Sequence, residues 1–268
     1  MKIMINDTQY DVDGNISLAK VQATYYPESD LAIVNTVLCT DPDLKLHEGD
    51  RLHFIKRGEL PQAQVLFELQ FARQPDALTQ SLQNACIGIA GAGGLGSVVA
   101  EILARAGVGR LVIADYDVVE PSNLNRQRFS LSQLGMPKVD ALADNIALFN
   151  PFIEITRVSE KITGNNCDDV FSSCMAVAEC FDSAENKAEL VAGLRLRLPD
   201  CSIVAVSGIA GLDDAQNIKI RKVSKRFYVV GDQHSDAQAG TGLLASRVGV
   251  AAALQAHHII RLITGEER

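Results

Sequence analysis

From about residue 65 onward, short apolar runs alternate with longer stretches in which apolar residues recur at helical spacing. Ala85–Ala90 is the first apolar run, and a helical pattern then covers Leu95–Ala106 and can end at Gly107. Arg110–Ala114 again has the character of a strand. Further helical stretches follow at 138–148, 184–196 and 240–264. Because strands and helices alternate, the pattern predicts an α/β fold with helices covering a mainly parallel sheet.

The first 60 residues follow a different pattern, in which short strands dominate. Lys2–Ile5 and Gln9–Val12 alternate in polarity around Asn6-Asp7, which is a hairpin signal. We expect a helix and two further strands, at 16–23, 32–38 and 52–55. The order β-β-α-β-β fits a small β-grasp fold. We therefore expect two domains, at 1–57 and 65–268, with a linker at 57–64.

Composition and charge favour a soluble enzyme of the cytoplasm. The chain has 268 residues, of which 47% are hydrophobic, and a formal net charge of -8. Lys and Arg form no block, so we expect no nucleic-acid partner. No apolar run approaches the roughly eighteen residues of a membrane span, and Met1–Met4 does not begin a signal peptide. The six cysteines show no C-x-x-C spacing, so we expect buried free thiols and no zinc.

A glycine-rich turn is expected between the strand at 85–90 and the helix that follows. Its glycines are Gly91, Gly93, Gly94 and Gly96. Backbone without side chains can approach phosphate closely, and a helix N-terminus presents unpaired N–H groups to an anion. Asp115 ends the next strand, where a carboxylate can accept hydrogen bonds from ribose hydroxyls. The combination predicts a nucleotide site, whereas the glycines alone would also fit a tight turn without a ligand.

A dense group of polar residues follows Asp115. It consists of Asp117, Asn123, Arg126 and Gln127, and then Lys138 after Gly135-Met136-Pro137. Together with the glycine turn, this segment resembles the ATP-binding core of the ThiF/MoeB/HesA adenylyltransferases, relatives of the ubiquitin-activating enzymes. The family motif runs from the Gly-rich loop through D-x-D and S-N-L-x-R-Q to G-x-x-K. Residues 65–265 are covered by the resemblance, which also implies a doubly wound, Rossmann-like sheet.

Two further segments extend the resemblance. Glu179–Ser183 falls at a strand end, where the family has a metal-binding Asp, here Asp182. Phe71–Gln74 matches the family's Y-x-R-Q segment, whose Arg, here Arg73, reaches into a neighbouring subunit's site. The resemblance therefore implies a homodimer that binds ATP and Mg²⁺, with Asp182 as the magnesium ligand.

Roles for the individual residues follow from the resemblance and from the chemistry of carboxylate activation. Arg73, Arg126 and Lys138 would neutralise phosphate charge, and Asn123 would donate to a phosphate oxygen. With Asp182, these are the expected catalytic residues. The carboxylate of a carrier protein has a reference pKa of about 3.5 and is already ionised at neutral pH, so no general base is required. The expected nucleotide-binding residues are Gly91, Gly93, Gly94, Gly96, Asp115, Asp117 and Gln127.

Several of these residues also have a purely structural interpretation. Lys138 could be a solvated residue at a helix start behind Pro137, and Asn123 or Arg126 could brace a turn. Asp182 could cap the helix that begins near Ala184. Cys180 is interpreted as a core residue and not as a nucleophile.

The chain departs from many family members in its cysteines. Relatives often carry two C-x-x-C pairs that hold zinc, and a cysteine in a late loop that forms a covalent link. Neither is present here, since no cysteine follows Cys201. The segments 206–211 and 226–232 resemble a shorter, zinc-free second ThiF family. Adenylation is therefore implied by the resemblance, but a covalent thiol step is not.

The N-terminal segment resembles the sulfur carrier ThiS, but it lacks the group that is activated in a carrier. The last expected strand runs into Lys56-Arg57-Gly58-Glu59, without Gly-Gly and without a free terminus. The domain cannot be the substrate, and we interpret it as a docking or regulatory unit, or as an accessory β-domain unrelated to carriers.

The sequence is compatible with two functions. The first is adenylation of the C-terminal glycine of a ThiS-like sulfur carrier in thiamine thiazole synthesis, or of a carrier in molybdopterin or cysteine synthesis, with a persulfide-bearing sulfur donor as a further partner. The second is a non-catalytic ATP-binding scaffold. We favour the enzyme, because a scaffold does not need Arg73, Asn123, Arg126, Lys138 and Asp182 together. The same residues disfavour an NAD-dependent oxidoreductase.

Overall fold

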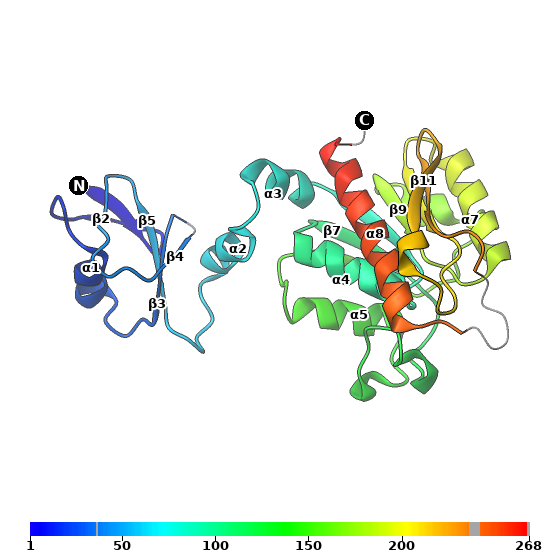
Figure 1. Cartoon of the computed structure of the whole chain (residues 1–268), viewed down its shortest axis with the longest axis horizontal. Helices are drawn as coiled ribbons and strands as arrows, with labels where there is room; N and C mark the ends of the chain where they lie inside the picture. Colours follow the sequence, from blue (N-terminus) through cyan, green and yellow to red (C-terminus); the bar gives the residue numbers. More distant parts are fainter. Residues whose placement is uncertain (36, 236–241, 267–268) are drawn as a thin grey trace. The chain divides into compact units, whose positions relative to one another are not determined.

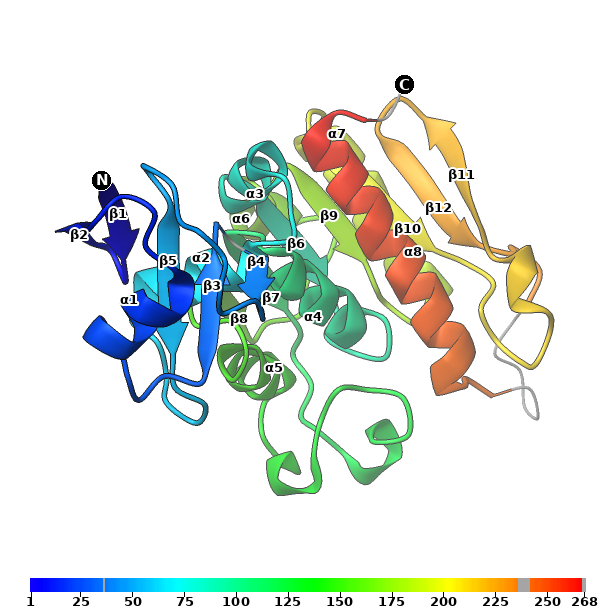
Figure 2. The same cartoon turned by 60° about the vertical axis from the view of Figure 1, so that its left-hand side comes forward.

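The computed structural model describes residues 1–35, 37–235 and 242–266. The chain divides into two compact units, Met1–Pro75 and Asp76–Arg268, and each is described by itself. Figures 1 and 2 show the elements of both units from two directions. Within the described ranges, no helix combines the length and the apolarity needed to cross a membrane.

The first unit is built on a five-stranded sheet in the order β2-β1-β5-β3-β4. The strands are β1 (Lys2–Ile5), β2 (Thr8–Asp11), β3 (Leu31–Val34), β4 (Val37–Cys39) and β5 (Arg51–Ile55). Helix α1 (Leu18–Tyr25) begins after Ser17, whose hydroxyl accepts a hydrogen bond from the Lys20 N–H. Ile3 and Ile5 alternate toward the core and share it with Leu18 and Val21. The small N-terminal strand domain expected from the sequence is confirmed.

The expected strand at 32–38 is wrong in one respect, because the run contains a turn. It folds into β3 and β4, which pair antiparallel with Ala32 opposite Cys39. Asn35 takes a φ of +50°, a left-handed conformation that Asn tolerates better than most residues. Its side chain donates to Asp50 and accepts a hydrogen bond from the Arg51 N–H, which holds the turn against β5.

Two short helices that the pattern did not predict follow β5. They are α2 (Ala63–Phe71), in the first unit, and α3 (Asp76–Gln83), in the second. Apolar residues are too dense in α2 to show a helical period. Helix α2 is tied to β5 through Glu68, which accepts hydrogen bonds of 3.2 Å from Arg51 and lies 3.6 Å from Nε2 of buried His53.

The second unit contains a seven-stranded sheet in the order β11-β12-β10-β9-β6-β7-β8. All neighbouring strands are parallel except the edge strand β11, which pairs antiparallel with β12. The strands are β6 (Cys86–Ala90), β7 (Arg110–Ala114), β8 (Glu154–Val158), β9 (Ala176–Glu179), β10 (Ser202–Val206), β11 (Lys219–Ser224) and β12 (Phe227–Gly231). The predicted mainly parallel, Rossmann-like sheet is confirmed.

Helices cover both faces of this sheet. The long helices are α4 (Gly96–Ala106), α5 (Lys138–Ala147), α7 (Ala184–Arg197) and α8 (Ala245–Thr264), and α6 (Cys167–Phe171) is short. Ile87 and Ile89 of β6 share one core with α4, α5 and α8, whereas Cys86 and Ala90 share the other with α6 and α7. Helix α8 begins at Ala245, later than the expected residue 240, and residues 240–241 lie outside the described ranges.

The direction of the sheet changes between β6 and β9. From β6 the chain continues outward to β7 and β8, and it then returns to the other side of β6 with β9, β10 and β12. A crevice at the carboxyl ends of such neighbouring strands is where open α/β sheets bind ligands. The glycine turn follows β6 at this edge, and Cys180–Asp182 follows β9. The topology therefore places two of the predicted site segments side by side.

Candidate nucleotide site

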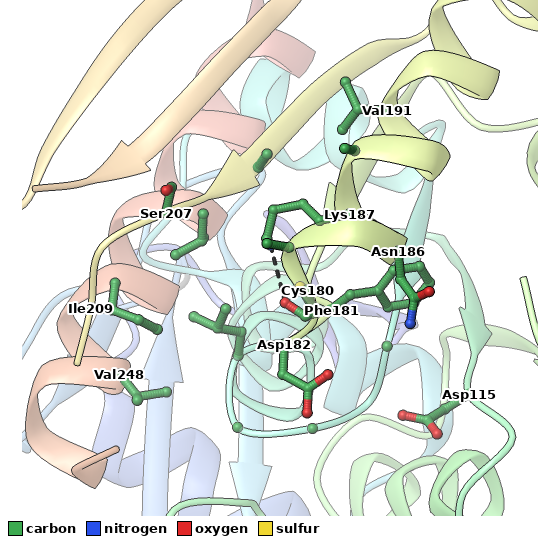
Figure 3. Close-up of a pocket in the computed structure, with 18 of the residues that line it drawn as sticks. Asp115, Cys180, Phe181, Asp182, Asn186, Lys187, Val191, Ser207, Ile209 and Val248 are labelled. Carbon is green, nitrogen blue, oxygen red and sulfur yellow. Dashed lines mark hydrogen bonds between the residues drawn. The ribbon is translucent and has the colours of Figure 1, made fainter. Parts of the chain in front are cut away.

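A cavity of about 860 Å³ lies at this edge of the sheet. Figure 3 shows part of its wall, with Asp115 and Asp182 in the same region of the pocket. Most residues proposed from the sequence line it, namely Gly91, Gly93, Gly94, Asp115, Asp117, Arg126, Gln127, Lys138 and Asp182. The topology thus brings together segments that are up to 91 residues apart, from Gly91 to Asp182.

The glycines of the turn serve different steric purposes. Gly91 has a φ of +94°, and a Cβ on it would lie 3.1 Å from the Cys180 carbonyl oxygen. A Cβ on Gly96, in the first turn of α4, would lie 1.7 Å from the Gly91 carbonyl oxygen. By contrast, the nearest atom to a Cβ on Gly93 is 3.8 Å away. Gly91 and Gly96 are therefore required by packing, whereas Gly93 leaves open space in front of the helix N-terminus for a ligand.

Asp115 supports the glycine turn. Its carboxylate accepts hydrogen bonds from the N–H groups of Ala92, at 2.6 Å, and Asp117, at 2.8 Å. Burial raises the pKa of Asp115 above its usual value, against the lowering effect of these hydrogen bonds and of Lys138. A carboxylate has about four acceptor sites, so a ribose hydroxyl could still be accommodated. Its contact with ribose stays a prediction.

Lys138 is a buried cation in the wall of the cavity. It is 6% exposed, and its Nζ lies 2.8 Å from the Asp117 carboxylate. It is the first residue of α5, and Pro137 precedes the helix. The interpretation of Lys138 as a solvated residue is therefore wrong, because its ammonium group is enclosed next to the glycine turn.

Within the S-N-L-x-R-Q segment, Asn123 braces the loop, whereas Arg126 and Gln127 line the cavity. Asn123 is 7% exposed, and its Oδ1 accepts a hydrogen bond of 3.0 Å from the Glu120 N–H. It does not line the cavity, so the structure shows the bracing interaction, and the contact with phosphate stays a prediction. Arg126 lines the cavity and donates to the Ser122 carbonyl at 3.0 Å. Gln127 also lines it, and its buried Oε1 has no hydrogen-bond partner among the described residues, so this acceptor is available to a ligand.

Asp182 follows β9 after Cys180 and Phe181 and points into the cavity region (Figure 3). The helix cap is Ser183, whose hydroxyl accepts a hydrogen bond of 3.3 Å from the Asn186 N–H, so the interpretation of Asp182 as the cap is wrong. Within the described ranges, no hydrogen bond or ion pair engages the Asp182 carboxylate. A carboxylate without such a protein partner is the oxygen ligand that Mg²⁺ takes in nucleotide sites, so the residues fit this ion.

Arg73 is the one proposed catalytic residue in the other unit. It follows α2 in Met1–Pro75 and is absent from the wall of the cavity. Its predicted action from a partner subunit stays a prediction.

Cys180 packs in the core beside the site. It is 6% exposed, and burial raises the pKa of its thiol well above the usual value. A thiol that stays protonated is a poor nucleophile, which supports the interpretation of Cys180 as a core residue.

In the described part of the chain, the group with metal-ligand geometry is Asp7, His53 and Glu68, and it contains no cysteine. Arg51 lies 3.6 Å from Asp7 and 3.2 Å from Glu68 and already balances these acids.

An ion pair that was not predicted from the sequence lies next to Asp182 and is formed by Glu179 and Lys187. Burial raises the pKa of Glu179, and the ammonium group of Lys187 opposes this change. The available signal was an acid at the end of the otherwise apolar run Ala176-Val177-Ala178. An ionised residue in such a place requires a partner.

Comparison with known proteins gives two family matches. The ThiF family model matches residues 67–268, and the ThiS-like ubiquitin model matches residues 1–58.

Three curated relatives are each similar to more than half of this chain. The Escherichia coli sulfur carrier protein ThiS adenylyltransferase is 32% identical over 191 residues, covering 70% of this chain and 76% of the relative. The Salmonella typhimurium molybdopterin-synthase adenylyltransferase is 29% identical, over 69% and 75% of the two chains. A Bacillus subtilis tRNA threonylcarbamoyladenosine dehydratase is 33% identical, over 58% and 63%.

Among solved structures, the E. coli tRNA N6-threonylcarbamoyladenosine dehydratase in complex with ATP has the same fold. It superposes with a TM-score of 0.68 at 24% identity, over 76% of this chain and 95% of that chain.

Proposed function

Because the chain belongs to the ThiF family, we propose that it is an adenylyltransferase that activates the C-terminal carboxylate of a ubiquitin-like sulfur carrier protein with ATP. The observation that carries the proposal is the cavity wall, which Arg126, Lys138 and Asp182 line together, while the Asp182 carboxylate has no hydrogen bond or ion pair among the described residues. An adenylyltransferase needs cations for the phosphates and an acid for the metal, and both belong to one pocket here.

In the proposed reaction, a carboxylate oxygen of the carrier attacks the α-phosphorus of ATP. The bond from the α-phosphorus to the bridging oxygen breaks, and pyrophosphate leaves with the electron pair of that bond. The carboxylate is already ionised at neutral pH, so no proton has to be removed. Lys138 and Arg126 would neutralise charge that accumulates on the phosphate oxygens, and the N-terminus of α4 would add backbone donors. Mg²⁺, held by Asp182, would supply further charge neutralisation when bound.

We assign the carrier to the ThiS type, which would place the reaction in thiazole formation for thiamine. The support is the similarity to the ThiS adenylyltransferase and the ThiS-like segment within the same chain. That segment cannot itself be activated, since Ile55 continues through Lys56 toward α2 and has no free carboxylate. The carrier is therefore a separate protein.

A tRNA substrate is the second candidate, because a tRNA-modifying dehydratase is among the relatives. Proteins that bind tRNA neutralise many phosphates with Lys and Arg. This chain carries 25 such residues against 33 acids, for a net charge of -8. The charge balance therefore favours a protein substrate.

Exchange of labelled pyrophosphate into ATP tests the proposal. Carriers of the ThiS and molybdopterin types, each ending in Gly-Gly, are compared with an otherwise identical carrier whose terminal carboxylate is amidated, and with tRNA. We expect exchange with a free carrier terminus, fastest with the ThiS type, and none with the amidated form. Exchange that depends on tRNA and on no carrier would overturn the proposed substrate.

A further inference from the structure

A buried ion pair lies directly beneath the turn that carries Asp182. Glu179 is fully buried at the end of β9, and Lys187, one turn into α7, is 20% exposed in its side chain. The Lys187 ammonium donates to Oε2 of Glu179. A buried ion pair is often no more stabilising than an apolar pair of similar size, because both charges lose their hydration. Stability alone therefore gives no reason for charges at this place.

The ion pair forms hydrogen bonds with both backbone polar groups of Phe181, its N–H and its carbonyl. Oε1 of Glu179 accepts a hydrogen bond of 2.7 Å from the Phe181 N–H. Nζ of Lys187 donates to the Phe181 carbonyl at 3.0 Å. Figure 3 shows Lys187 turned toward this segment. Because Phe181 directly precedes Asp182, the ion pair sets the direction in which the chain leaves β9.

The neighbouring residues are fixed as well. Fully buried Gln255 of α8 donates to the Glu179 carbonyl at 3.1 Å, and its Oε1 lies 3.6 Å from the Cys180 sulfur. Ser183 caps α7 on the other side of Asp182. The residues around Asp182 are thus held by side chains from three elements, whereas the Asp182 carboxylate itself lines the cavity and has no partner in the described part of the chain.

The segment Cys180–Asp182 also packs against the glycine loop. An added Cβ on Gly91 would lie 3.1 Å from the Cys180 carbonyl oxygen and 3.2 Å from the Phe181 ring. A shift of Phe181 would therefore move Asp182 relative to the glycine loop that is proposed to hold the phosphates.

We propose that Glu179 and Lys187 are positioning residues that act through the Phe181 backbone and set Asp182 at the distance from the glycine loop that a metal-bound nucleotide requires. This inference rests on the proposed function for the chemistry of the pocket. It adds two residues that touch neither the metal nor the nucleotide, although Lys187 lines the cavity.

The test measures how ATP binding and pyrophosphate exchange depend on Mg²⁺ concentration, in Lys187→Met, Glu179→Gln and the double variant. We expect the Mg²⁺ concentration for half-maximal exchange to rise by about 10- to 100-fold in each single variant, as for loss of a group that orients a metal ligand. ATP binding without Mg²⁺ should stay within about twofold of the parent protein, because the glycine loop is intact. The double variant should be no worse than the worse single variant, since both substitutions break the same contact.

Lys187→Arg is the conservative control and should restore part of the Mg²⁺ response. Arg157→Gln is the control at another site: it removes an exposed ion pair with Asp140, outside the cavity, and should leave the response unchanged. The double variant leaves no unpaired buried charge, so it keeps the test available if a single variant does not fold.

Two results would overturn the inference. The first is lower thermal stability in folded variants with an unchanged Mg²⁺ response, which indicates a purely structural pair. The second is that Lys187→Met weakens ATP binding in the absence of Mg²⁺, both alone and in the double variant with Glu179→Gln. That result would indicate that Lys187 contacts a phosphate directly. If the parent chain binds Mg²⁺-ATP but none of the carriers supports pyrophosphate exchange, the proposed function fails. The measurement of Mg²⁺-dependent ATP binding then still tests the role of the ion pair. Failure of the parent to bind Mg²⁺-ATP overturns both.

Discussion

Lys138 and Asp182 carry the opposite charges on which the proposed chemistry depends. Lys138 is enclosed beside Asp117, and Asp182 presents a free carboxylate to the cavity. We predict that Lys138→Ala and Asp182→Ala each slow carrier-dependent pyrophosphate exchange by about a hundredfold or more, as for loss of a strong electrostatic contact in the transition state. The measurement is steady-state exchange at saturating ATP, with folding checked by circular dichroism. Exchange at the parent rate in both variants would show that the site is assigned wrongly.

Residues that stand at fixed places in a motif could be predicted from the sequence. The glycine turn, Asp117, Arg126 and Lys138 were found in this way, and the structure gathers them around one cavity. Glu179 was signalled by its place after an apolar run, but its pairing with Lys187 could not be predicted, because the two side chains meet only when β9 and α7 pack together. Asn123 is a different case, because the sequence left both a phosphate contact and a bracing role open, and the structure shows its side chain bracing the Glu120 backbone.

Among the elements, the contact between α4 and the glycine turn leaves no room for a side chain. A Cβ on Gly96 would lie 1.7 Å from the Gly91 carbonyl oxygen, whereas Gly249 in α8 has no neighbouring atom within 4 Å of an added Cβ. We predict that Gly96→Ala destabilises the protein by about 1–3 kcal/mol or more through overpacking. Gly249→Ala should stabilise it by roughly 0.5–1 kcal/mol, since Ala is the better helix former.

Chemical denaturation of the two glycine variants, together with ATP titration, measures both effects. Gly96→Ala should also weaken ATP binding, because the helix N-terminus must move away from the turn. Equal stabilities of the two variants would contradict the close packing of α4 against the Gly91 backbone.

The end of β12 and the start of α8 are joined by an ion pair between Asp232 and Arg247. Burial alone would raise the pKa of Asp232, but hydrogen bonds from Ser235 and His234 and the charge of Arg247 lower it to about 2. The unfolded-state pKa is about 3.9, so the pair stabilises the fold fully above that pH, and the contribution is lost as pH falls through about 2.

We predict that Asp232→Asn lowers the free energy of unfolding at pH 5 and above, and that the difference from the parent shrinks as pH falls toward 2. Urea denaturation between pH 2 and 6 measures it. A difference that is constant over this range would show that the charge of Asp232 contributes nothing.

Helices and strands could be predicted where apolar residues recur regularly over several residues and where a residue such as glycine marks the end of the element. Strand β7 has the bounds that the pattern predicts, and α4 ends at Gly107, which has a φ of +95°. The hairpin at Asn35 was hidden inside one apolar run. Helix α2 was missed because its apolar residues are too closely spaced to show a face.

For the molecule as a whole, Arg73 is the residue that would link one chain to the active site of another. It lies in the first unit and does not line the cavity of its own chain. We predict that Arg73→Ala and Asp182→Ala homodimers are both nearly inactive, and that mixed dimers regain about half of the parental exchange. One site of the mixed dimer then contains an intact Asp182 and an intact Arg73 from the partner. In this account, Arg73 neutralises charge on the ATP phosphates.

Separately tagged variants, co-purified to isolate mixed dimers, allow this measurement. If Arg73 acts within its own chain, every site of the mixed dimer lacks one group, and exchange does not return.

The organisation into a ThiS-like segment and a ThiF-like segment could be predicted from the sequence, and both family matches agree with it. The carrier could not be identified in this way. Carrier choice depends on side chains that meet across a docking surface, and such side chains have no fixed spacing along the chain.

Transfer of the α-phosphate of ATP to the carrier tests the central proposal most directly. The chain is incubated with Mg²⁺, ATP labelled at the α-phosphate, and a ThiS-type carrier ending in Gly-Gly, and the carrier is analysed by intact mass and by label. We predict an adenylated carrier, formed together with pyrophosphate and absent when the terminal carboxylate is amidated. ATP binding without label on any carrier, in a protein that is folded and loaded with Mg²⁺, would contradict the assignment as an adenylyltransferase and favour a scaffold.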